Sequence, residues 1–449
     1  MVKAMEPLVI PRKEHRISRK QMSPNAVRTL YRLHSNGFIA YLVGGCVRDM
    51  LLGRKPKDFD IATDARPGQI KRLFRNCRLI GRRFRLAHLH FQDEILEVCT
   101  FRRSAVPSDT RDDGDAPETD QKPRRPWHLT NEDGMILVDN IFGTPEEDAL
   151  RRDFTINALA YNIADFSVID FSTGLQDLQQ GLIRLIGDPQ VRFTEDPVRM
   201  LRAVRFAASH KFVIETATWE KLCDLSSTIS RANPARLYEE IQKLFLLGSS
   251  RPAFSLLRQS GLLAGLFPWL DRWLDNNLAR ATFLETRLDS LDPLRGSPDQ
   301  PSLAFFLAAL FGPSIEELAL DLHRTGIPHH QALDQTFADF MKETCETVSV
   351  PGKIGIRLRA ILGLQASLKR MPKRRPAVIA NRPEFLEALA YLRLSSETHS
   401  EYRASADWWS SFITNSPPRD SEEQAEEQTA SKTRRKRRRK YRRRPKGTA

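Results

Sequence analysis

The pattern of hydrophobic and polar positions changes near residue 165. On its N-terminal side, short apolar runs alternate with polar segments and predict strands at 39–47, 58–63, 85–91, 95–101 and 167–171. Residues 25–37 have the spacing of an amphipathic helix that ends at Gly37. From about residue 196 to residue 394, apolar residues recur every three or four positions. The chain is therefore expected to be α+β, with a small mixed-sheet domain followed by an all-helical body.

Two segments lack both periodicities. Residues 104–132 contain few aliphatic side chains and many Asp, Pro and Thr residues, which is typical of a mobile insertion. Residues 415–449 begin with an acidic stretch rich in Ser, Glu and Gln and end in a basic run. We expect this tail to be disordered in the absence of a partner. The helical body shows no fixed period, so a solenoid is not expected.

Composition places most of the positive charge in that tail. The chain has 449 residues, is 41% hydrophobic and carries a net charge of +14, so it can bury the cores of two or three domains. Residues 432–446 alone contain 12 Lys or Arg and no acid. Such a run binds polyanions by counterion release without sequence preference. A basic run of this kind is also typical of a nuclear-import signal or of a segment that binds an anionic membrane surface. The sequence shows no lipidation motif or apolar anchor that would favour membrane binding.

Several classes of protein are disfavoured. No run of 18 apolar residues occurs, and the N-terminus lacks the apolar segment of a secretion signal, so we expect no membrane span and a cytoplasmic protein. The five cysteines are scattered without a C-x-x-C pair, which disfavours zinc and redox sites. His88 and His90 share one strand face, but without a Cys or a third His nearby they are not expected to bind zinc.

The stretch "KDFDIAT" places Asp58 and Asp60 one residue apart, with Phe59 and Ile61 between and after them. In a strand, residues i and i+2 share a face, so the two Cα atoms would lie roughly 6 to 7 Å apart. Two carboxylates at this separation repel each other and tend to recruit a divalent cation. Taken alone, the pair is also compatible with a solvated strand end that carries two unrelated acids.

The residues upstream strengthen the functional interpretation. Gly44 and Gly45 follow an apolar strand and precede a helical segment that contains Arg48. In this arrangement, backbone N–H groups at a helix N-terminus can face phosphate oxygens. A Gly-Gly turn, an arginine and a D-x-D pair in this order therefore predict a site for a nucleotide and its metal ion.

This arrangement resembles the class II branch of the nucleotidyltransferase superfamily related to DNA polymerase β, which includes CCA-adding enzymes and bacterial poly(A) polymerases. Three further blocks resemble the family's motifs in the same order: "EEDALRRDFTINALAYN" at 146–162, "TEDPVRMLRAVRFA" at 194–207 and "NPARLYEEIQKLF" at 233–245. The resemblance runs from about residue 10 to residue 270. The segment "NCRLIGRRFRLAHLHF" (76–91) and the basic tail favour the bacterial poly(A) polymerases.

The resemblance implies a division of the chain into five parts. These are a basic N-terminal arm (1–25), a catalytic domain (26–165), a helical neck that binds the nucleotide base (166–250), an RNA-binding helical body (251–414) and the basic tail (415–449). The implied activity is template-independent transfer of AMP from ATP to RNA 3′ ends. The alternatives are a CCA-adding tRNA nucleotidyltransferase and a non-catalytic RNA-binding protein on the same fold, although the retained acids argue against a protein without activity.

Transfer of AMP requires in-line attack on the α-phosphorus, which two Mg²⁺ ions about 4 Å apart can assist. Mn²⁺ is an alternative metal. Asp58 and Asp60 supply two ligands, and a third acid should come from a neighbouring strand. Glu97 is one candidate because its charge interrupts an apolar run. Asp153 is the other candidate, and its role could equally be to orient an arginine or the ribose.

Nucleotide contacts are assigned on the resemblance. Gly44, Gly45, Arg48 and Arg152 are expected to bind the phosphates of ATP. Asp196 and Arg199 are expected to read the base, since a carboxylate accepts from the adenine amine and a guanidinium donates to the ring nitrogen. Cytosine presents the same pattern, so this pair cannot separate A-only from C-and-A addition. Arg82, Arg83, Arg85 and Arg151 add positive charge for phosphates. Expected partners are RNA 3′ ends and RNA-decay proteins, and the protein is expected to be a monomer.

Overall fold

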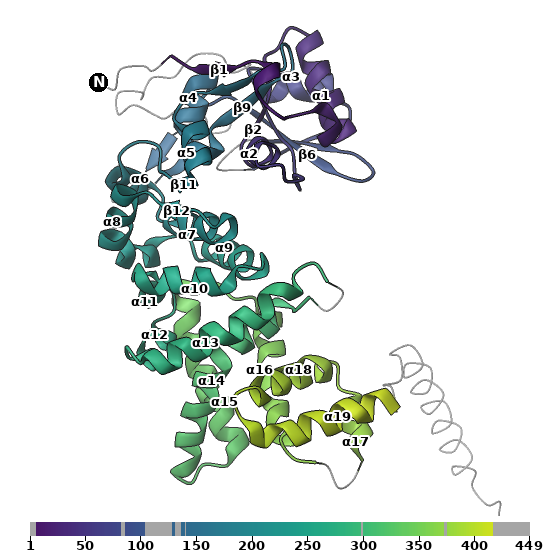
Figure 1. The fold of residues 1–449 in the computed structure, drawn as a ribbon, viewed down its shortest axis with the longest axis vertical. Coiled ribbons are helices and arrows are strands. Elements are labelled where there is room, and N and C mark those ends of the chain that lie inside the picture. The colour runs from purple at the N-terminus through teal and green to yellow at the C-terminus, as the bar shows by residue number, and fades with distance from the viewer. Residues whose placement is uncertain are drawn as a thin grey trace, which may run out of the picture. The chain divides into compact units, whose positions relative to one another are not determined.

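The computed structural model describes residues 6–81, 86–103, 128–130, 136–139, 141–297, 300–371 and 375–415. The chain forms two compact units (Figure 1). The first comprises Met1–Asp271 with Glu346–Ser349, and the second comprises Arg272–Cys345 with Val350–Ala449. Each unit is described by itself.

The first unit is built on a mixed eight-stranded sheet. Its strands lie in the order β1 (Leu8–Ile10), β10 (Val168–Asp170), β9 (Leu159–Asn162), β2 (Ala40–Val43), β3 (Asp60–Thr63), β6 (Ile95–Thr100), β5 (Leu86–His90) and β4 (Cys77–Ile80). The β3–β6 pair is parallel and the other pairs are antiparallel. The sequence prediction of a small mixed-sheet domain is therefore confirmed.

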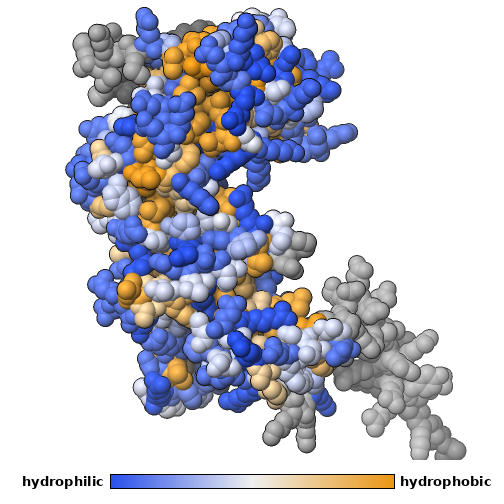
Figure 2. All heavy atoms as spheres, viewed as in Figure 1, coloured by the Kyte–Doolittle hydropathy of each residue, from blue (hydrophilic) through white to orange (hydrophobic). Residues whose placement is uncertain are grey.

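One hydrophobic cluster holds the central strands together. It is formed by buried side chains from β2, β3, β9 and β10 and from the residue after β6, namely Val43, Ala62, Ala160, Ile169 and Phe101. In Figure 2, hydrophilic side chains cover most of the viewed face of this unit, and hydrophobic ones gather over the strands. Burial of these side chains stabilises the sheet by about 25 cal/mol for each Å² of apolar surface removed from water. The cluster fixes the strands whose ends carry the acidic residues.

Short helices connect the strands of this sheet. They are α1 (Pro24–Ser35), α2 (Gly45–Leu51), α3 (Pro67–Leu73) and α4 (Pro145–Leu150). Helix α1 begins with a Ser23 side chain that accepts from the backbone N–H of Ala26, and Pro24 occupies its first turn. Gly37 follows the helix with φ +82°, a conformation that favours glycine. The expected helix at 25–37 is confirmed.

The rest of the first unit is mainly helical. Its elements are α5 (Gly174–Gln180), β11 (Leu182–Ile183), α6 (Pro189–Glu195), α7 (Val198–His210), β12 (Val213–Ile214), α8 (Thr216–Leu225), α9 (Pro234–Leu246), α10 (Ser250–Gln259) and α11 (Leu262–Leu266), followed by α12 (Pro268–Leu274) at the unit boundary. Helix α7 packs against α9 and α10. This packing brings the Asp196–Arg199 segment next to the family-like block at 233–245.

The second unit is helical throughout its described residues. Its helices are α13 (Leu278–Leu291), α14 (Leu303–Arg324), α15 (His329–Thr347), α16 (Gly352–Leu368), α17 (Pro376–Ala380), α18 (Phe385–Ser396) and α19 (Arg403–Asn415). Helix α14 is long and apolar enough to span a membrane by length and composition, with a mean hydropathy of 1.6. However, 72% of that window is buried inside the structure, as in the central helix of a bundle.

The structure departs from the sequence expectation at two boundaries. Strand β1 lies within the segment expected to be an arm, because residues 8–10 pair with β10 and complete one edge of the sheet. Strand β10 continues the sheet past residue 165, the expected end of the catalytic domain. Most of the 104–132 insertion, the 416–449 tail and Arg82, Arg83 and Arg85 lie outside the described residues, so the expectations for them stay predictions.

Candidate active site

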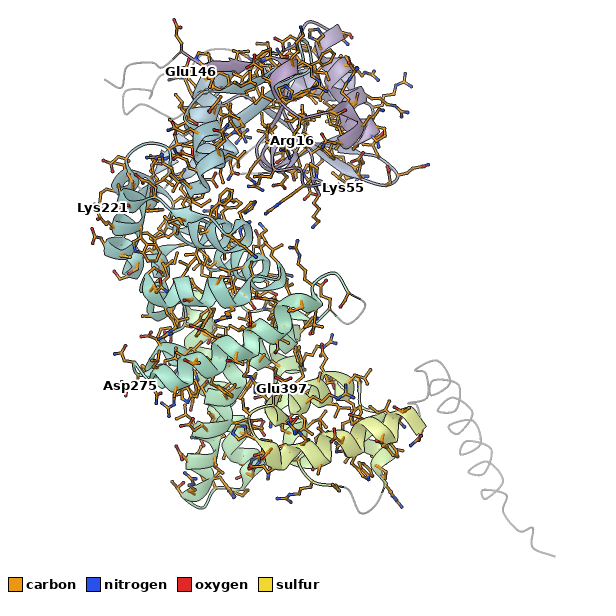
Figure 3. All side chains as sticks on the ribbon, viewed as in Figure 1. Arg16, Lys55, Glu146, Lys221, Asp275 and Glu397 are labelled. Carbon is orange, nitrogen blue, oxygen red and sulfur yellow. The ribbon has the colours of Figure 1, made fainter. Side chains whose placement is uncertain are left out.

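Asp58 and Asp60 lie at the N-terminal end of β3. Asp60 is the first residue of the strand, and Asp58 belongs to the loop that precedes it. Phe59 and Ile61 are buried, whereas both aspartates are exposed. The alternation in the sequence therefore predicts which side chains point inward. Lys55, labelled in Figure 3, lies on the same loop between α2 and β3.

Glu97 lies beside Asp60. Strands β3 and β6 are parallel, and their register pairs Asp60 with Glu97. On the other side of β6, Glu97 is paired with His88 of β5, and His88 Nε2 lies 3.3 Å from Glu97 Oε1. Side chains at paired positions share a face of a sheet. The structure thus aligns Asp60, Glu97 and His88 in one row across three adjacent strands.

The electrostatics of this row favour a cation. The surrounding protein desolvates the Asp60 carboxylate, and Glu97 and Asp58 repel it, so its pKa rises to about 6 although Arg152 acts in the opposite direction. Neither Asp58 nor Asp60 forms a salt bridge or a side-chain hydrogen bond within the described part of the chain. A raised carboxylate pKa without a paired protein cation is typical of a site whose counter-ion is supplied by a ligand.

A complete metal cage is not preformed. Among the described residues, no group of three or more His, Cys, Asp or Glu side chains has the geometry of a metal site. This agrees with nucleotide-dependent Mg²⁺ sites. In such sites one or two carboxylates bind the ion, while phosphates of the substrate and water molecules complete its coordination shell. The donor set at the end of β3 consists of carboxylate oxygens, which Mg²⁺ prefers. The residues present therefore fit a divalent cation bound together with a nucleotide.

The Gly44–Gly45 turn lies next to Asp60. We call Asp58, Asp60 and Glu97 together the acidic row. Gly44 has φ +79° and ψ −139°, a region almost restricted to glycine, and α2 begins at the next residue. A Cβ atom at position 44 would lie 3.2 Å from Arg152 Nη1 and 3.9 Å from Asp60 Oδ2. The absence of a side chain leaves room between the guanidinium and the carboxylate. The turn, Arg152 and Asp60 therefore meet as the sequence motifs suggest.

Arg152 is held by a buried carboxylate. Its Nη2 atom lies 3.0 Å from Oδ2 of Asp148, whose side chain is 3% exposed, and Arg151 binds the other oxygen of the same group. The segment begins with a capping box formed by Thr144 and Glu147, which starts α4 and places both arginines at its C-terminal end. Asp148 thus orients the Arg152 guanidinium toward Gly44 and Asp60.

Arg48 has internal partners. Its Nε and Nη2 atoms donate to Asp49 and its Nη1 donates to Asn157, at distances of 2.7 to 2.9 Å. The guanidinium also lies over the Phe206 ring, and the residue is only 6% exposed. Arg48 therefore links α2 to the segment after Asp153 and to α7. The expected contact between Arg48 and phosphate stays a prediction.

Asp153 is fully engaged within the protein. One carboxylate oxygen accepts from the Phe154 backbone and from Asn157, and the other accepts two bonds, of 2.8 and 2.5 Å, from Arg202 of α7. Burial alone would raise the pKa of Asp153, but Arg202 and these hydrogen bonds lower it well below its usual range. These partners, Phe154, Asn157 and Arg202, do not belong to the acidic row. Of the two candidates for the third acid, only Glu97 is adjacent to Asp60.

The proposed base-reading pair is also engaged internally. Asp196 forms a two-pronged ion pair with Arg236 of α9, at 2.8 and 2.7 Å. Arg199 donates to the Arg192 carbonyl at 2.7 Å and to Glu195 at 3.0 Å. The two residues lie at the start of α7, as the family-like block suggests. Contact with a base would require these partners to be exchanged or shared.

Sequence reasoning missed two arginines that organise the site. Arg202 binds Asp153, and Arg236 binds Asp196. A signal for Arg202 is present in the sequence, because Arg199, Arg202 and Arg205 recur at three-residue intervals and so lie near one another on a helix. Arg236 has no comparable signal, since it lies 40 residues from its partner.

The chain is similar to known proteins over most of its length. Residues 40–184 match the family described as "Poly A polymerase head domain", residues 211–274 match "Probable RNA and SrmB- binding site of polymerase A", and residues 325–444 match "Polymerase A arginine-rich C-terminus". Poly(A) polymerase I of Salmonella typhi is 42% identical over 415 residues, which cover 91% of this chain and 86% of that protein. The CCA-adding enzyme of Lactobacillus gasseri is 37% identical over 237 residues, or 53% of this chain and 54% of that protein.

A solved structure shares the fold. The Bacillus stearothermophilus CCA-adding enzyme in complex with CTP aligns with a TM-score of 0.54 over 87% of this chain and 84% of that chain, at 24% sequence identity. At this identity the likeness concerns the fold. It agrees with the sequence expectation of a mixed-sheet domain followed by helices.

Proposed function

Since this chain belongs to the poly(A) polymerase family, we propose that it performs the family's reaction at the acidic row formed by Asp58, Asp60 and Glu97. The protein is a template-independent polynucleotide adenylyltransferase that adds AMP from ATP to RNA 3′ ends. The observation that supports the proposed location is the register of β3 and β6, which sets Glu97 beside Asp60.

Mg²⁺ is the proposed cofactor, with Asp58, Asp60 and Glu97 as its protein ligands and Mn²⁺ as an alternative. The support is the oxygen donor set, the raised pKa of Asp60 and the lack of a paired cation at Asp58 and Asp60 within the described residues. When bound, such an ion lowers the pKa of the attacking 3′-hydroxyl and stabilises charge on the leaving pyrophosphate. Asp58, Asp60 and Glu97 would hold the ion, and the buried Asp148 holds Arg152 in place to bind a phosphate oxygen of ATP.

The Gly44–Gly45 turn is proposed to accept the triphosphate. Because Gly44 has no Cβ, a phosphate group can approach the backbone between Arg152 and Asp60. Asp153 is proposed as a positioning residue that ties α7 to this region through Arg202. The distance between the row and the base-reading residues would then depend on one buried ion pair.

Base selection is proposed to belong to Asp196 and Arg199. Arg236 and Glu195 bind these side chains and fix their orientation. Selection of adenine over cytosine is supported by the comparisons, in which the poly(A) polymerase relative matches over a much larger share of the chain than the CCA-adding relative. RNA binding by this region is supported by the match of residues 211–274 to the family described as "Probable RNA and SrmB- binding site of polymerase A", and RNA-decay proteins stay proposed partners. We also propose that the protein is a monomer and that it is cytoplasmic.

The metal assignment makes a prediction that separates Glu97 from Asp153 and extends to His88. Glu97→Gln and His88→Ala should raise the Mg²⁺ concentration for half-maximal AMP transfer by about tenfold or more, because loss of a ligand or of the group that orients it typically weakens metal binding by 10- to 100-fold. Asp153→Asn should lower the rate at every Mg²⁺ concentration without changing this requirement. The measurement is a Mg²⁺ titration of initial rates.

His90 supplies the matched control for His88. It occupies the same strand face, with its ring centroid 6.2 Å from that of His88, and it does not pair with Glu97. His90→Ala should therefore keep the wild-type Mg²⁺ requirement. Mn²⁺ binding in the presence of a non-hydrolysable ATP analogue, followed by electron paramagnetic resonance, gives a second readout that needs no turnover. A shifted metal requirement in Asp153→Asn, with none in Glu97→Gln, would contradict the assignment.

A further inference from the structure

The second unit contains a cavity that the reaction described above does not use. Its volume is about 390 Å³, within the range of about 300 to 1,000 Å³ that is typical of ligand sites. Helices α15 and α16 and the turn between α17 and α18 line it, and all of the lining residues belong to the second unit. These helices are labelled in Figure 1. We call this cavity the α15–α16 pocket.

The floor and the rim of the α15–α16 pocket differ in chemistry. Apolar or small residues of α15 and α16 contribute to its lining, namely Leu333, Ala360, Gly363 and Leu364. The rim carries nitrogen donors and polar groups, namely His329, His330, Arg359, Ser367, Arg382 and Glu384. A flat aromatic base suits the apolar part, and a phosphate suits the arginines. This combination fits a nucleotide better than a purely apolar ligand.

Several rim groups have unused hydrogen-bonding capacity. Within the described part of the chain, the side chains of His330, Ser367 and Arg382 have no hydrogen-bond or ion-pair partner. Arg359 is different, since Asp334 holds it at 2.6 Å from Nε. The pKa of His329 is lowered by burial and by His323, Lys369 and Arg370, although Glu316 acts in the opposite direction. Among the rim groups, the exposed Arg382 therefore offers the clearest contact for an anion.

A glycine keeps the pocket open. A Cβ atom at position 363 would lie 2.3 Å from Arg359 Nη1, and the other contacts given for it are also with the Arg359 guanidinium. No backbone or core side chain lies among these nearest atoms. A larger side chain at this position would therefore enter the pocket and displace the guanidinium, and the helix core would not have to move.

We propose that the α15–α16 pocket binds one internal nucleotide of the RNA substrate, with its phosphate on Arg382 and its base on the apolar floor. This inference rests on the proposed function, which makes RNA the polymer that the protein holds. The 3′-terminal nucleotide must reach the acidic row of the first unit, so a nucleotide in the second unit is an internal one. The exposed rim at His330, Ser367 and Arg382 allows the strand to enter and leave the pocket. Glu384 can accept from a ribose 2′-hydroxyl or an exocyclic amine.

The test is equilibrium binding of a fluorescently labelled, unstructured RNA to the full-length protein, without ATP or metal, by fluorescence anisotropy. Gly363→Leu fills the pocket and keeps every charge, and Arg382→Ala removes one unpaired donor. Arg382→Ala should raise the Kd for RNA by about tenfold, because it removes a charge-assisted hydrogen bond to a phosphate. Gly363→Leu should raise it by a similar factor, because its side chain occupies the space of the base. Thermal melting of each variant checks that the fold is kept.

Two matched controls separate the pocket from general effects. Gly352→Leu makes the same substitution on α16 at a position where a Cβ atom would meet nothing within 4 Å. Arg295→Ala removes an exposed arginine of the second unit that does not line the pocket. Both should leave the Kd within about twofold of wild type. Equal RNA binding by Gly363→Leu and Gly352→Leu would overturn the proposal.

A further arm distinguishes RNA from a free nucleotide. AMP binding is measured by calorimetry for wild type and Gly363→Leu. Wild-type AMP binding that is lost in Gly363→Leu, together with an unchanged Kd for RNA, would identify a free-nucleotide site and overturn the RNA proposal. Because both measurements need no catalysis, an error in the assignment of Asp58, Asp60 and Glu97 would leave them readable.

Discussion

Asp60→Asn is expected to lower the rate of AMP transfer by about a thousandfold or more, since loss of metal-assisted charge stabilisation costs several kcal/mol and each 1.36 kcal/mol is a factor of ten. The same substitution should leave the free energy of unfolding unchanged or slightly higher at pH 7. Desolvation by the surrounding protein and repulsion by Glu97 and Asp58 disfavour the charged form of Asp60. Removal of that charge relieves the repulsion without opening a cavity.

Steady-state kinetics with ATP and an RNA primer, together with urea unfolding, measure the two effects. Asp58→Asn should behave in the same way. Asp224→Asn is the matched control, because Asp224 is a 60% exposed acid of the first unit whose ion pair within the described residues is with Lys221 on α8. It should keep the wild-type rate. An Asp60→Asn protein that retained a tenth of the wild-type rate would show that Asp60 is not a metal ligand.

Asp153→Ala is expected to destabilise the protein by about 3 kcal/mol, the scale for loss of one partner from a buried ion pair. The substitution leaves Arg202 with a 3.6 Å contact to Glu240 and the face of the Phe206 ring. It also removes the acceptor of Asn157 and of the Phe154 N–H. The effect comes from structure, so the Mg²⁺ requirement of the folded fraction should not change.

The destabilisation should depend on pH. Because the pKa of Asp153 is lowered in the folded state, the folded protein binds fewer protons than the unfolded chain near the unfolded pKa of about 3.9. The stability contributed by Asp153 is therefore present above that pH and is lost as the pH falls below it. Urea unfolding at pH 7 and pH 3 should show a larger difference between wild type and Asp153→Ala at pH 7. An equal and small difference at both values would mean that Arg202 does not depend on Asp153.

The central part of the site could be predicted from sequence because it depends on local patterns. The alternation of Asp58 and Asp60 with Phe59 and Ile61 fixes which side chains face outward from a strand end. The Gly44 turn is also local, because its positive φ requires glycine. The sequence alone left Glu97 and Asp153 open as the third acid. Strand register sets Glu97 beside Asp60, and no feature within one segment reveals that register.

Other features depend on pairing between distant segments. Arg236 meets Asp196 only because α9 packs against α7. Strand β1 is short, and residues 8 and 9 are half exposed, so the polar sequence around it gives little strand signal. Its place in the sheet follows from pairing with β10, more than 150 residues away. Arg48 lies in the same sequence motif as Gly44 and Gly45. However, two of the residues that contact its guanidinium, Asn157 and Phe206, belong to distant segments of the chain.

The most direct measurement of the central claim is extension of a labelled, unstructured RNA that lacks any tRNA fold, with each of the four nucleoside triphosphates in turn. With ATP and Mg²⁺, wild-type protein should produce a long ladder, CTP should give little extension, and Asp60→Asn should give none. The opposite result would be a product that stops after two or three nucleotides, requires CTP and forms only on tRNA-like substrates. That result would contradict poly(A) addition at this site and establish CCA addition.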